Sequence, residues 1–307
     1  MDGKTFRFVY SEWEKEKRND VKASSLATYV TNADKHLIPT FGDMTMITEP
    51  DVRDFVNDKL TAGLSVSTVR DLLVVLRMIA KFGMRRGWNG YREWDVRLPR
   101  DDRPKDLPVL TVQEQRRLMN FLRDNFSFRN LGLYICLCTG LRIGEICALK
   151  WSDIRLDVKS IRITRTVGRI YNDADDRRST HVVITTPKTL NSVREIPLCG
   201  DLIRMLKPFV HILSKDNFVL TNSQKPLEPR LYRRYYKLTM AKIGLPSIRF
   251  HGLRHTFATR CMESNCDYKT ISSILGHANI TTTMNLYVHP DMEQKRRCID
   301  KMLKRMK

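Results

Sequence analysis

The stretch from His251 to Tyr287 reads HGLRHTFATRCMESNCDYKTISSILGHANITTTMNLY, and the rest of the chain is best interpreted from it. His251 and Arg254 are three residues apart, so in a helix they share one face. Apolar residues recur behind them at helical spacing, at Leu253, Phe257, Ala258, Cys261 and Met262. This pattern predicts an amphipathic helix that presents two polar side chains near its start.

A second amphipathic run covers residues 268–275 and ends at Gly276, which is followed at once by His277. A polar, threonine-rich turn then leads to Tyr287. Taken singly, each residue has an ordinary explanation, because a histidine beside an apolar face is usually packed or exposed and a tyrosine is often a core aromatic. Together they place two histidines, an arginine and a tyrosine where their side chains can converge on a phosphate.

The wording of this stretch resembles the C-terminal signature of the tyrosine recombinases (integrases), a family that includes Xer-type, phage and transposon enzymes. Two upstream segments match as well, namely TGLRIGEICALKWSDI around Arg142 and TPKTLNSVREIPL around Lys188. Six separated positions agree in type and order, which is far more specific than one short pattern. The resemblance covers residues 107–307 and, more loosely, the N-terminal third. The spacing from His277 to Tyr287 and the wording TTMNLYVH are nearer to the transposon and phage integrases than to the Xer type.

The resemblance implies a site-specific DNA recombinase that integrates, excises or inverts DNA through a 3′-phosphotyrosyl intermediate, with strand exchange via a Holliday junction. Tyr287 would be the nucleophile, because its phenoxide is also a reasonable leaving group and the step can be reversed. Arg142 and Arg254 offer planar guanidinium groups that match the non-bridging phosphate oxygens.

Four further positions carry roles by the same resemblance. His277 would donate a hydrogen bond to the phosphate, and Lys188 would protonate the departing 5′-oxygen. His251 would be a general base or acid near the tyrosine. Glu145 occupies an acidic position of the family and is expected to support the site rather than react. No metal triad or nucleotide-binding loop is recognisable, so neither a metal nor a cofactor is expected.

Composition points to a polyanionic partner. Lys and Arg number 54 against 34 Asp and Glu, which gives a net charge of +20 and an isoelectric point near 9.8. Such an excess favours nucleic acid over a membrane surface or a merely soluble basic protein. The seven cysteines are odd in number and contain no CxxC pair, which favours a reducing cytoplasm. The longest apolar run, residues 131–141, is too short to cross a membrane, which takes ~20 residues. The expected location is therefore the bacterial cytoplasm, in association with the nucleoid.

Residues 5–97 predict helices only. Four apolar stripes begin near Phe6, Leu26, Thr48 and Ser67, the second being ended by Pro39 and Gly42 and the fourth by Gly87. Four short helices can close one small bundle, which resembles the core-binding domain of the family. Its candidate DNA contacts are Lys22, Ser24, Ser25, Arg70, Arg77, Lys81, Arg85 and Arg86. Any single one is more often a solvated charge, so the cluster carries the prediction.

The chain is therefore divided into a helical DNA-binding domain at 1–100, a linker at 101–108, a catalytic domain at 109–290 and a C-terminal tail helix at 291–307. The linker is rich in proline and charge, and the catalytic domain opens with the capping box Thr111–Glu114. No arm-binding domain is expected before the first helix, which starts within about ten residues of Met1. By resemblance, the two domains would clamp a duplex.

Within the catalytic domain, residues 131–138 predict a buried helix, and Arg142 is expected in the first turn of the next one, where free N–H groups favour an anion. The segments IRITRTV, HVVITT and VREIPL predict one small antiparallel sheet, with Lys188 in its last turn. A helix at 201–209 and a short strand, FVL, follow. The expected fold class is mainly α with a small antiparallel β-sheet (α+β).

The segment from Pro229 to Gly244 predicts a basic helix. Its Arg230, Arg233, Arg234 and Lys237 alternate with tyrosines, so it is either a helix presented to DNA or a basic surface helix with aromatic packing. By resemblance, the tail at 291–307 would pack on a neighbouring protomer and help to build a homotetramer on double-stranded DNA from a chain that is a monomer in solution.

Two other functions are compatible with these residues. A type IB topoisomerase would use the same chemistry to relax DNA without pairing two sites, but the tail and the small N-terminal bundle argue against it. A non-catalytic DNA-binding protein derived from an integrase would be expected to have lost Tyr287 or an arginine, and all six positions are filled.

Overall fold

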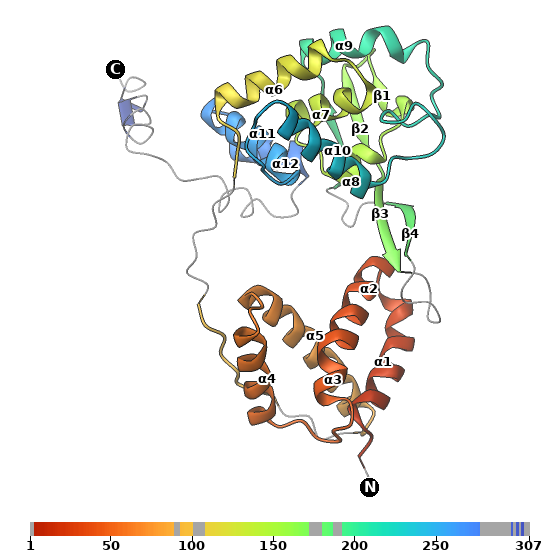
Figure 1. Ribbon diagram of the computed structural model, residues 1–307, viewed down its shortest axis with the longest axis vertical. Coiled ribbons are helices and arrows are strands. Elements are labelled where there is room, and N and C mark those ends of the chain that lie inside the picture. The colour runs from red at the N-terminus through yellow and green to blue at the C-terminus, as the bar shows by residue number, and fades with distance from the viewer. Residues whose placement is uncertain are drawn as a thin grey trace. The chain divides into compact units, whose positions relative to one another are not determined.

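The computed structural model describes residues 3–88, 93–100, 108–171, 180–186 and 192–276, together with residues 296, 299, 300, 302 and 303. The chain divides into two compact units (Figure 1). The first comprises residues 1–105 and 169–181, and the second comprises residues 106–168 and 182–307. Helices dominate both units, and in the described part of the chain the strands lie within residues 154–197, so the predicted fold class is confirmed. No helix in the described part of the chain is long and apolar enough to cross a membrane.

The first unit is a bundle of helices. They are α1 (Phe6–Asp20), α2 (Ala23–Asn32), the π-helical segment η1 (Ala33–Leu37), α3 (Ile38–Phe41), α4 (Glu49–Thr61) and α5 (Val66–Arg85). Side-chain caps fix three of the starts, because the hydroxyls of Thr5, Thr48 and Ser65 accept hydrogen bonds from backbone amides of the first turns. The four predicted apolar stripes form the core, which is confirmed by the burial of Phe6, Leu37, Val52 and Leu76.

The prediction that Pro39 and Gly42 end the second helix is confirmed for Gly42, which caps the helical path, and is wrong for Pro39. The helical path runs from α2 through η1 and α3 to Phe41. The π-helical turn ends at Leu37, and α3 begins a new hydrogen-bonded segment at Ile38, so Pro39 lies in the first turn of α3. A missing backbone N–H costs little in a first turn, and the chain therefore tolerates proline at this point.

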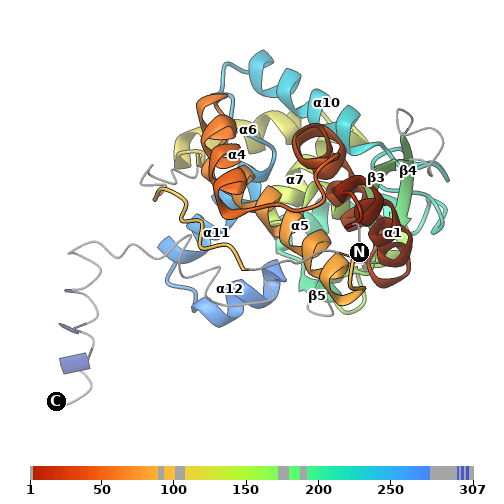
Figure 2. The same ribbon diagram turned by 90° about the horizontal axis from the view of Figure 1, so that it is seen from below.

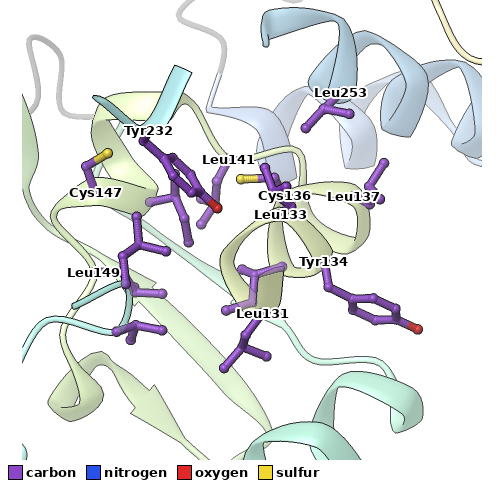
Figure 3. Packing of buried hydrophobic residues seen from close by; sticks show 14 of the residues in the cluster. Leu131, Leu133, Tyr134, Cys136, Leu137, Leu141, Cys147, Leu149, Tyr232 and Leu253 are labelled. Atoms are coloured by element: carbon purple, nitrogen blue, oxygen red, sulfur yellow. The ribbon is translucent and has the colours of Figure 1, made fainter. Parts of the chain in front are cut away.

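The second unit contains α6 (Val112–Asp124), α7 (Phe128–Thr139), α8 (Ile143–Cys147), the 3₁₀ turn η2 (Trp151–Asp153), α9 (Gly200–Val210), α10 (Pro229–Lys242), α11 (His251–Glu263) and α12 (Tyr268–Leu275). The predicted buried helix α7 is its centre. Leu131, Leu133 and Cys136 of α7 pack with Tyr232 from α10 and Leu253 from α11 (Figure 3). Helices α11 and α12 lie side by side in both views of the ribbon (Figures 1 and 2), and Ala258, Ile271 and Leu275 form a small core between them.

The single sheet predicted from the sequence is in fact two sheets. Strands β1 (Ile154–Arg155), β2 (Ser160–Ile163) and β5 (Arg194–Pro197) form one antiparallel sheet, in which Ile161 pairs with Ile154 and Ile196. Strands β3 (Thr166–Tyr171) and β4 (Thr180–Thr185) form the other. The segment IRITRTV breaks after Ile163, where Arg165 pairs with Asp153, so its two halves find different partners.

Two smaller predictions concern a short strand and the tail helix, and only the first is wrong. Residues 218–220 form no strand, because only Phe218 makes isolated bridges, to Lys150 and Ser223, and the chain turns at once at Asn222, whose φ is 46°. The C-terminal tail is described only at residues 296, 299, 300, 302 and 303, which are helical. Ile299, Met302 and Leu303 of this tail are exposed. The remaining tail residues and linker residues 101–107 lie outside the described residues.

Candidate active site

Arg142 stands at the N-cap of α8, directly after a turn that only glycine suits. Helix α7 ends at Gly140, whose φ is +65°, and a Cβ there would lie 2.6 Å from Leu275 Cδ2 and 2.7 Å from Phe257 Cδ1. The backbone amide of Arg142 donates to Glu145 Oε2 at 2.9 Å, and its Nη1 donates to Glu145 Oε1 at 2.8 Å. The prediction that Arg142 lies within a first turn with free N–H groups is therefore wrong, because it precedes the turn and its amide is already bound by a carboxylate.

Glu145 is a buried carboxylate between two arginines, and it is only 4% exposed. Arg194 of β5 grips both of its oxygens, with Nη2 2.9 Å from Oε2 and Nη1 3.1 Å from Oε1. Burial alone would raise the pKa of the Glu145 carboxyl, but hydrogen bonds and charge from Arg194, and then from Arg142, hold the pKa below its ordinary value. Glu145 is therefore an ionised support for this cluster.

Arg194 was not among the predicted site residues. Its side chain is only 6% exposed. The alternation of strand residues could have revealed it, because Arg194 has the same parity as the buried Ile196 and must face inward with it. An arginine on an inward face requires an acidic partner, which Glu145 supplies.

The C-terminal end of α12 collects three guanidinium groups. Arg194 Nε donates to the carbonyl oxygen of Ile274 at 2.6 Å, Arg254 Nη2 to that of Leu275 at 2.8 Å, and Arg142 Nη2 to that of Gly276 at 3.2 Å. Gly276 ends the helix with a φ of 66°. Cations are favourable at this position, because the last carbonyls of a helix carry partial negative charge. The chain continues from Gly276 directly into His277.

Arg254 is held inside the unit by α11. It is 1% exposed, and Nη1 donates to the carbonyl oxygen of Gly140 at 2.9 Å. With the bond to Leu275, two of the five N–H groups of a guanidinium are engaged on these carbonyls. The two predicted arginines, Arg142 and Arg254, are thus brought to the same turn of the chain from different helices.

His251 is the first residue of α11, and its ring meets the ring of His255 edge to face at 4.6 Å between centroids. Burial is the main cause that lowers the pKa of His251 to about 4, and the charges of His255, Arg254 and Arg142 act in the same direction. Burial and then Arg254 also lower the pKa of His255. Both imidazoles are therefore neutral near pH 7, as a proton acceptor must be.

A basic pocket of about 740 Å³ adjoins this cluster. Four basic side chains from α10 line it, together with Arg249 from the segment before α11, His251 at the start of α11 and Ile143 from α8; the four are Arg230, Arg233, Arg234 and Lys237. All four are exposed. Tyr232, which lies between them in the sequence, faces the core instead, since it is buried and its hydroxyl donates to the carbonyl oxygen of Arg129 at 2.8 Å. The aromatic packing predicted for this helix is therefore confirmed, and the presentation of its basic face to DNA stays a prediction. Arg249 of the same pocket was missed by the sequence analysis.

In the first unit, the predicted DNA contacts separate into two groups. Arg70, Lys81 and Arg85 are exposed along α5, with Arg77 half-buried beside them and bonded to the carbonyl oxygen of Trp94 at 3.5 Å. These positions recur at helical spacing, so they form one basic stripe. Lys22, Ser24, Ser25 and Arg86 lie elsewhere: the first three are at the start of α2, and Arg86 is engaged by Glu16 and stacks over the ring of Phe82.

Three predicted catalytic residues, Lys188, His277 and Tyr287, lie outside the described residues. The described residues contain no group of three or more His, Cys, Asp or Glu side chains that could hold a metal ion. Their six cysteines form no disulfide.

Comparison with known proteins assigns the chain to a protein family. The model of the phage integrase family matches residues 108–294, more than half of the chain, and the model of the phage integrase N-terminal SAM-like domain matches residues 5–60. The chain belongs to the phage integrase family. The family predicted from the sequence is therefore confirmed, and with it the enzyme class, a tyrosine-type site-specific recombinase.

The relatives of this chain include both a Xer-type recombinase and an integrase. The chain is 25% identical over 280 residues to a XerC-like tyrosine recombinase of Caldanaerobacter subterraneus subsp. tengcongensis, covering 84% of this chain and 71% of that protein. It is also 25% identical over 295 residues to the ICEBs1 integrase of Bacillus subtilis, covering 89% and 75%. In fold it is similar to the integrase of transposon Tn1549 solved with transposon right end DNA, with a TM-score of 0.81 at 20% identity, covering 98% of this chain and all of that one.

Proposed function

We propose that this phage integrase family member cuts double-stranded DNA by attack of the Tyr287 hydroxyl oxygen on a backbone phosphorus. The bond from Tyr287 Oη to phosphorus forms as the bond from phosphorus to the 5′-oxygen breaks, which leaves a 3′-phosphotyrosyl link and a free 5′-hydroxyl. The number of phosphoester bonds is unchanged, so attack by another 5′-hydroxyl reverses the step without ATP. The observation that supports this proposal is the meeting of Arg142 and Arg254 at the end of α12, with His251 close enough for both charges to lower its pKa.

The transition state carries more negative charge on its non-bridging oxygens than the ground state. Three guanidinium groups gather at the end of α12, and one buried carboxylate pairs with two of them, so the cluster keeps net positive charge where that negative charge develops. Arg142 is the more accessible of the two proposed phosphate ligands, with a side chain 36% exposed. In our proposal, His277 adds a hydrogen bond to the phosphate and Lys188 gives its proton to the departing 5′-oxygen.

His251 suits the role of general base better than that of general acid. Its pKa of about 4 means that the neutral ring predominates at pH 7 and can accept the proton of the Tyr287 hydroxyl. The imidazolium that forms is disfavoured beside Arg254 and Arg142, so it would give up that proton readily. The buried ring of His255 fixes the orientation of His251 by contact.

We propose that the basic pocket beside α10 and the α5 stripe bind DNA phosphates on either side of the cleaved one. Exposed arginines and lysines that pair with no carboxylate among the described residues suit this role, since phosphate contacts supply most of the affinity for DNA. A DNA partner places the protein on the nucleoid of the bacterial cytoplasm. The exposed Ile299, Met302 and Leu303 of the tail support docking on a neighbouring protomer, so a monomer in solution would become a tetramer on paired sites.

A nicked suicide duplex tests the chemistry. Candidate sites are the paired inverted repeats in DNA that flanks the gene. We expect an SDS-resistant protein–DNA adduct without divalent metal, and none with Tyr287→Phe. An adduct that survives Tyr287→Phe or needs magnesium would refute the mechanism, and site-specific binding without any adduct would favour a non-catalytic DNA-binding protein.

A further inference from the structure

Arg194 is an arginine whose donors are almost all used inside the protein. Besides the two bonds to Glu145, its Nε donates to the carbonyl oxygen of Ile274 and its Nη1 to that of Ser192, at 3.2 Å. Its side chain is 6% exposed, against 36% for that of Arg142. Arg194 is therefore closed off from any substrate, while Arg142, which binds the same carboxylate, keeps an exposed edge.

The charge on Glu145 decides what Arg142 can do. A buried carboxylate at 2.8 Å attracts a guanidinium strongly, because little solvent screens the pair. With Arg194 on both oxygens, the carboxylate is already neutralised and Arg142 adds surplus charge. Without Arg194, Arg142 would be the principal cation on this carboxylate. The negative charge of Glu145 would then neutralise the positive charge of Arg142.

We infer that Arg194 is a positioning residue for DNA cleavage, which neutralises Glu145 so that the charge of Arg142 remains available to the phosphate. The same side chain ties β5 to the last turn of α12 through Ile274, one turn before the segment that carries His277 and Tyr287. The inference rests on the proposed function, since it needs a phosphate at Arg142. It assigns a role in the reaction to a residue that touches no substrate.

A double substitution separates this role from simple support of the fold. We would measure the single-turnover rate of adduct formation on the nicked duplex, with half-site affinity and thermal unfolding measured alongside. Arg194→Met should slow cleavage by about 10²-fold, the cost of losing one aligned transition-state donor, with half-site affinity nearly unchanged. Adding Glu145→Gln removes the uncompensated carboxylate and should restore most of that loss.

Two further variants keep the test decisive. Arg194→Lys retains the positive charge but loses the paired N–H donors of the guanidinium group. This variant should therefore cleave clearly faster than Arg194→Met. Arg155→Met is the matched control, because Arg155 also pairs with a carboxylate, Glu195, but on an exposed part of the same sheet. It should cleave at the parental rate. If Arg194→Met proves too unstable to purify, the Lys variant and the double variant carry the same comparison against the parent.

The cleavage rates of these variants decide whether Arg194 has a positioning role or a structural one. A double variant that is no faster than Arg194→Met, or a Lys variant that is as slow as the Met variant, overturns the positioning role and leaves Arg194 a structural residue. Failure of the unaltered protein to form any adduct would refute the proposed function and this inference together.

Discussion

Arg142 and Arg254 meet at one carbonyl oxygen, that of Leu275, at 3.4 Å and 2.8 Å. They come from the α7–α8 turn and from α11, which are far apart in the chain, and the last turn of α12 holds them together. Because a helix end carries partial negative charge, it can hold two like-charged groups close to each other before any phosphate arrives. Backbone carbonyl oxygens thus help to hold both guanidinium groups, and the Glu145 carboxylate is a further anchor for Arg142.

The first prediction concerns the turn that places Arg142. Gly140→Ala should lower the free energy of unfolding by about 3 kcal/mol, because a Cβ is strained at φ +65° and overlaps Leu275 and Phe257. Cleavage should fall as well, since Arg254 binds the carbonyl oxygen of residue 140. Gly244→Ala is the control, with a similar φ of +62° but its nearest contact at 3.9 Å, and should cost only about 1–2 kcal/mol. Chemical denaturation measures both; equal losses would show that packing around Gly140 contributes nothing.

The second prediction concerns the pH dependence given by His251. Because burial and nearby cations lower the pKa of the ring to about 4, its basic form persists from neutral pH down to that value. Protonation of His251 should therefore not limit cleavage at any pH above about 5. His251→Gln should slow cleavage on the order of 10²-fold throughout that range. An NMR titration of the ring gives the direct measurement, and a midpoint near the ordinary value of 6.5 would contradict the proposed environment.

The helices and their ends were predictable because their signals are local. The capping boxes at Thr48 and Thr111 and the left-handed glycines Gly87 and Gly276 lie where the sequence placed element ends. The path through Pro39 was not predictable in this way, because the π-helical turn that accommodates it depends on how the chain packs into the bundle.

The sheets and part of the site depend on contacts between distant segments. Nothing near Thr164 marks a strand end, since the break involves the pairing of Arg165 with Asp153. Family resemblance located Arg142 and Glu145, but the importance of Arg194 appears only when β5 brings it to Glu145 and to the end of α12. Motifs identify reactive groups, whereas the residues that hold them are found from the fold.

The third prediction concerns the basic pocket. Arg233→Ala and Arg234→Ala should each weaken DNA binding about equally for all sequences and lower the slope of log affinity against log salt by about 1, one phosphate contact apiece. Arg204→Ala is the matched control, because this exposed arginine of α9 pairs with Asp201 and does not line the pocket. Affinity measured across a salt series gives the slopes. Slopes unchanged in both pocket variants would mean that these arginines are merely solvated.

The last prediction concerns the tail. Ile299, Met302 and Leu303 are exposed, an arrangement that favours burial on another surface when one is available. Deletion of residues 293–307 should leave binding to a half-site nearly intact, because the basic pocket and the α5 stripe remain. Cooperative occupancy of a full site, synapsis and recombination should all fall, and cleavage should become less regulated. Gel-shift titrations on half-site and full-site DNA, beside a recombination assay, make the comparison. A truncated protein that still binds the full site cooperatively and recombines at the parental rate would show that the tail does not hold protomers together.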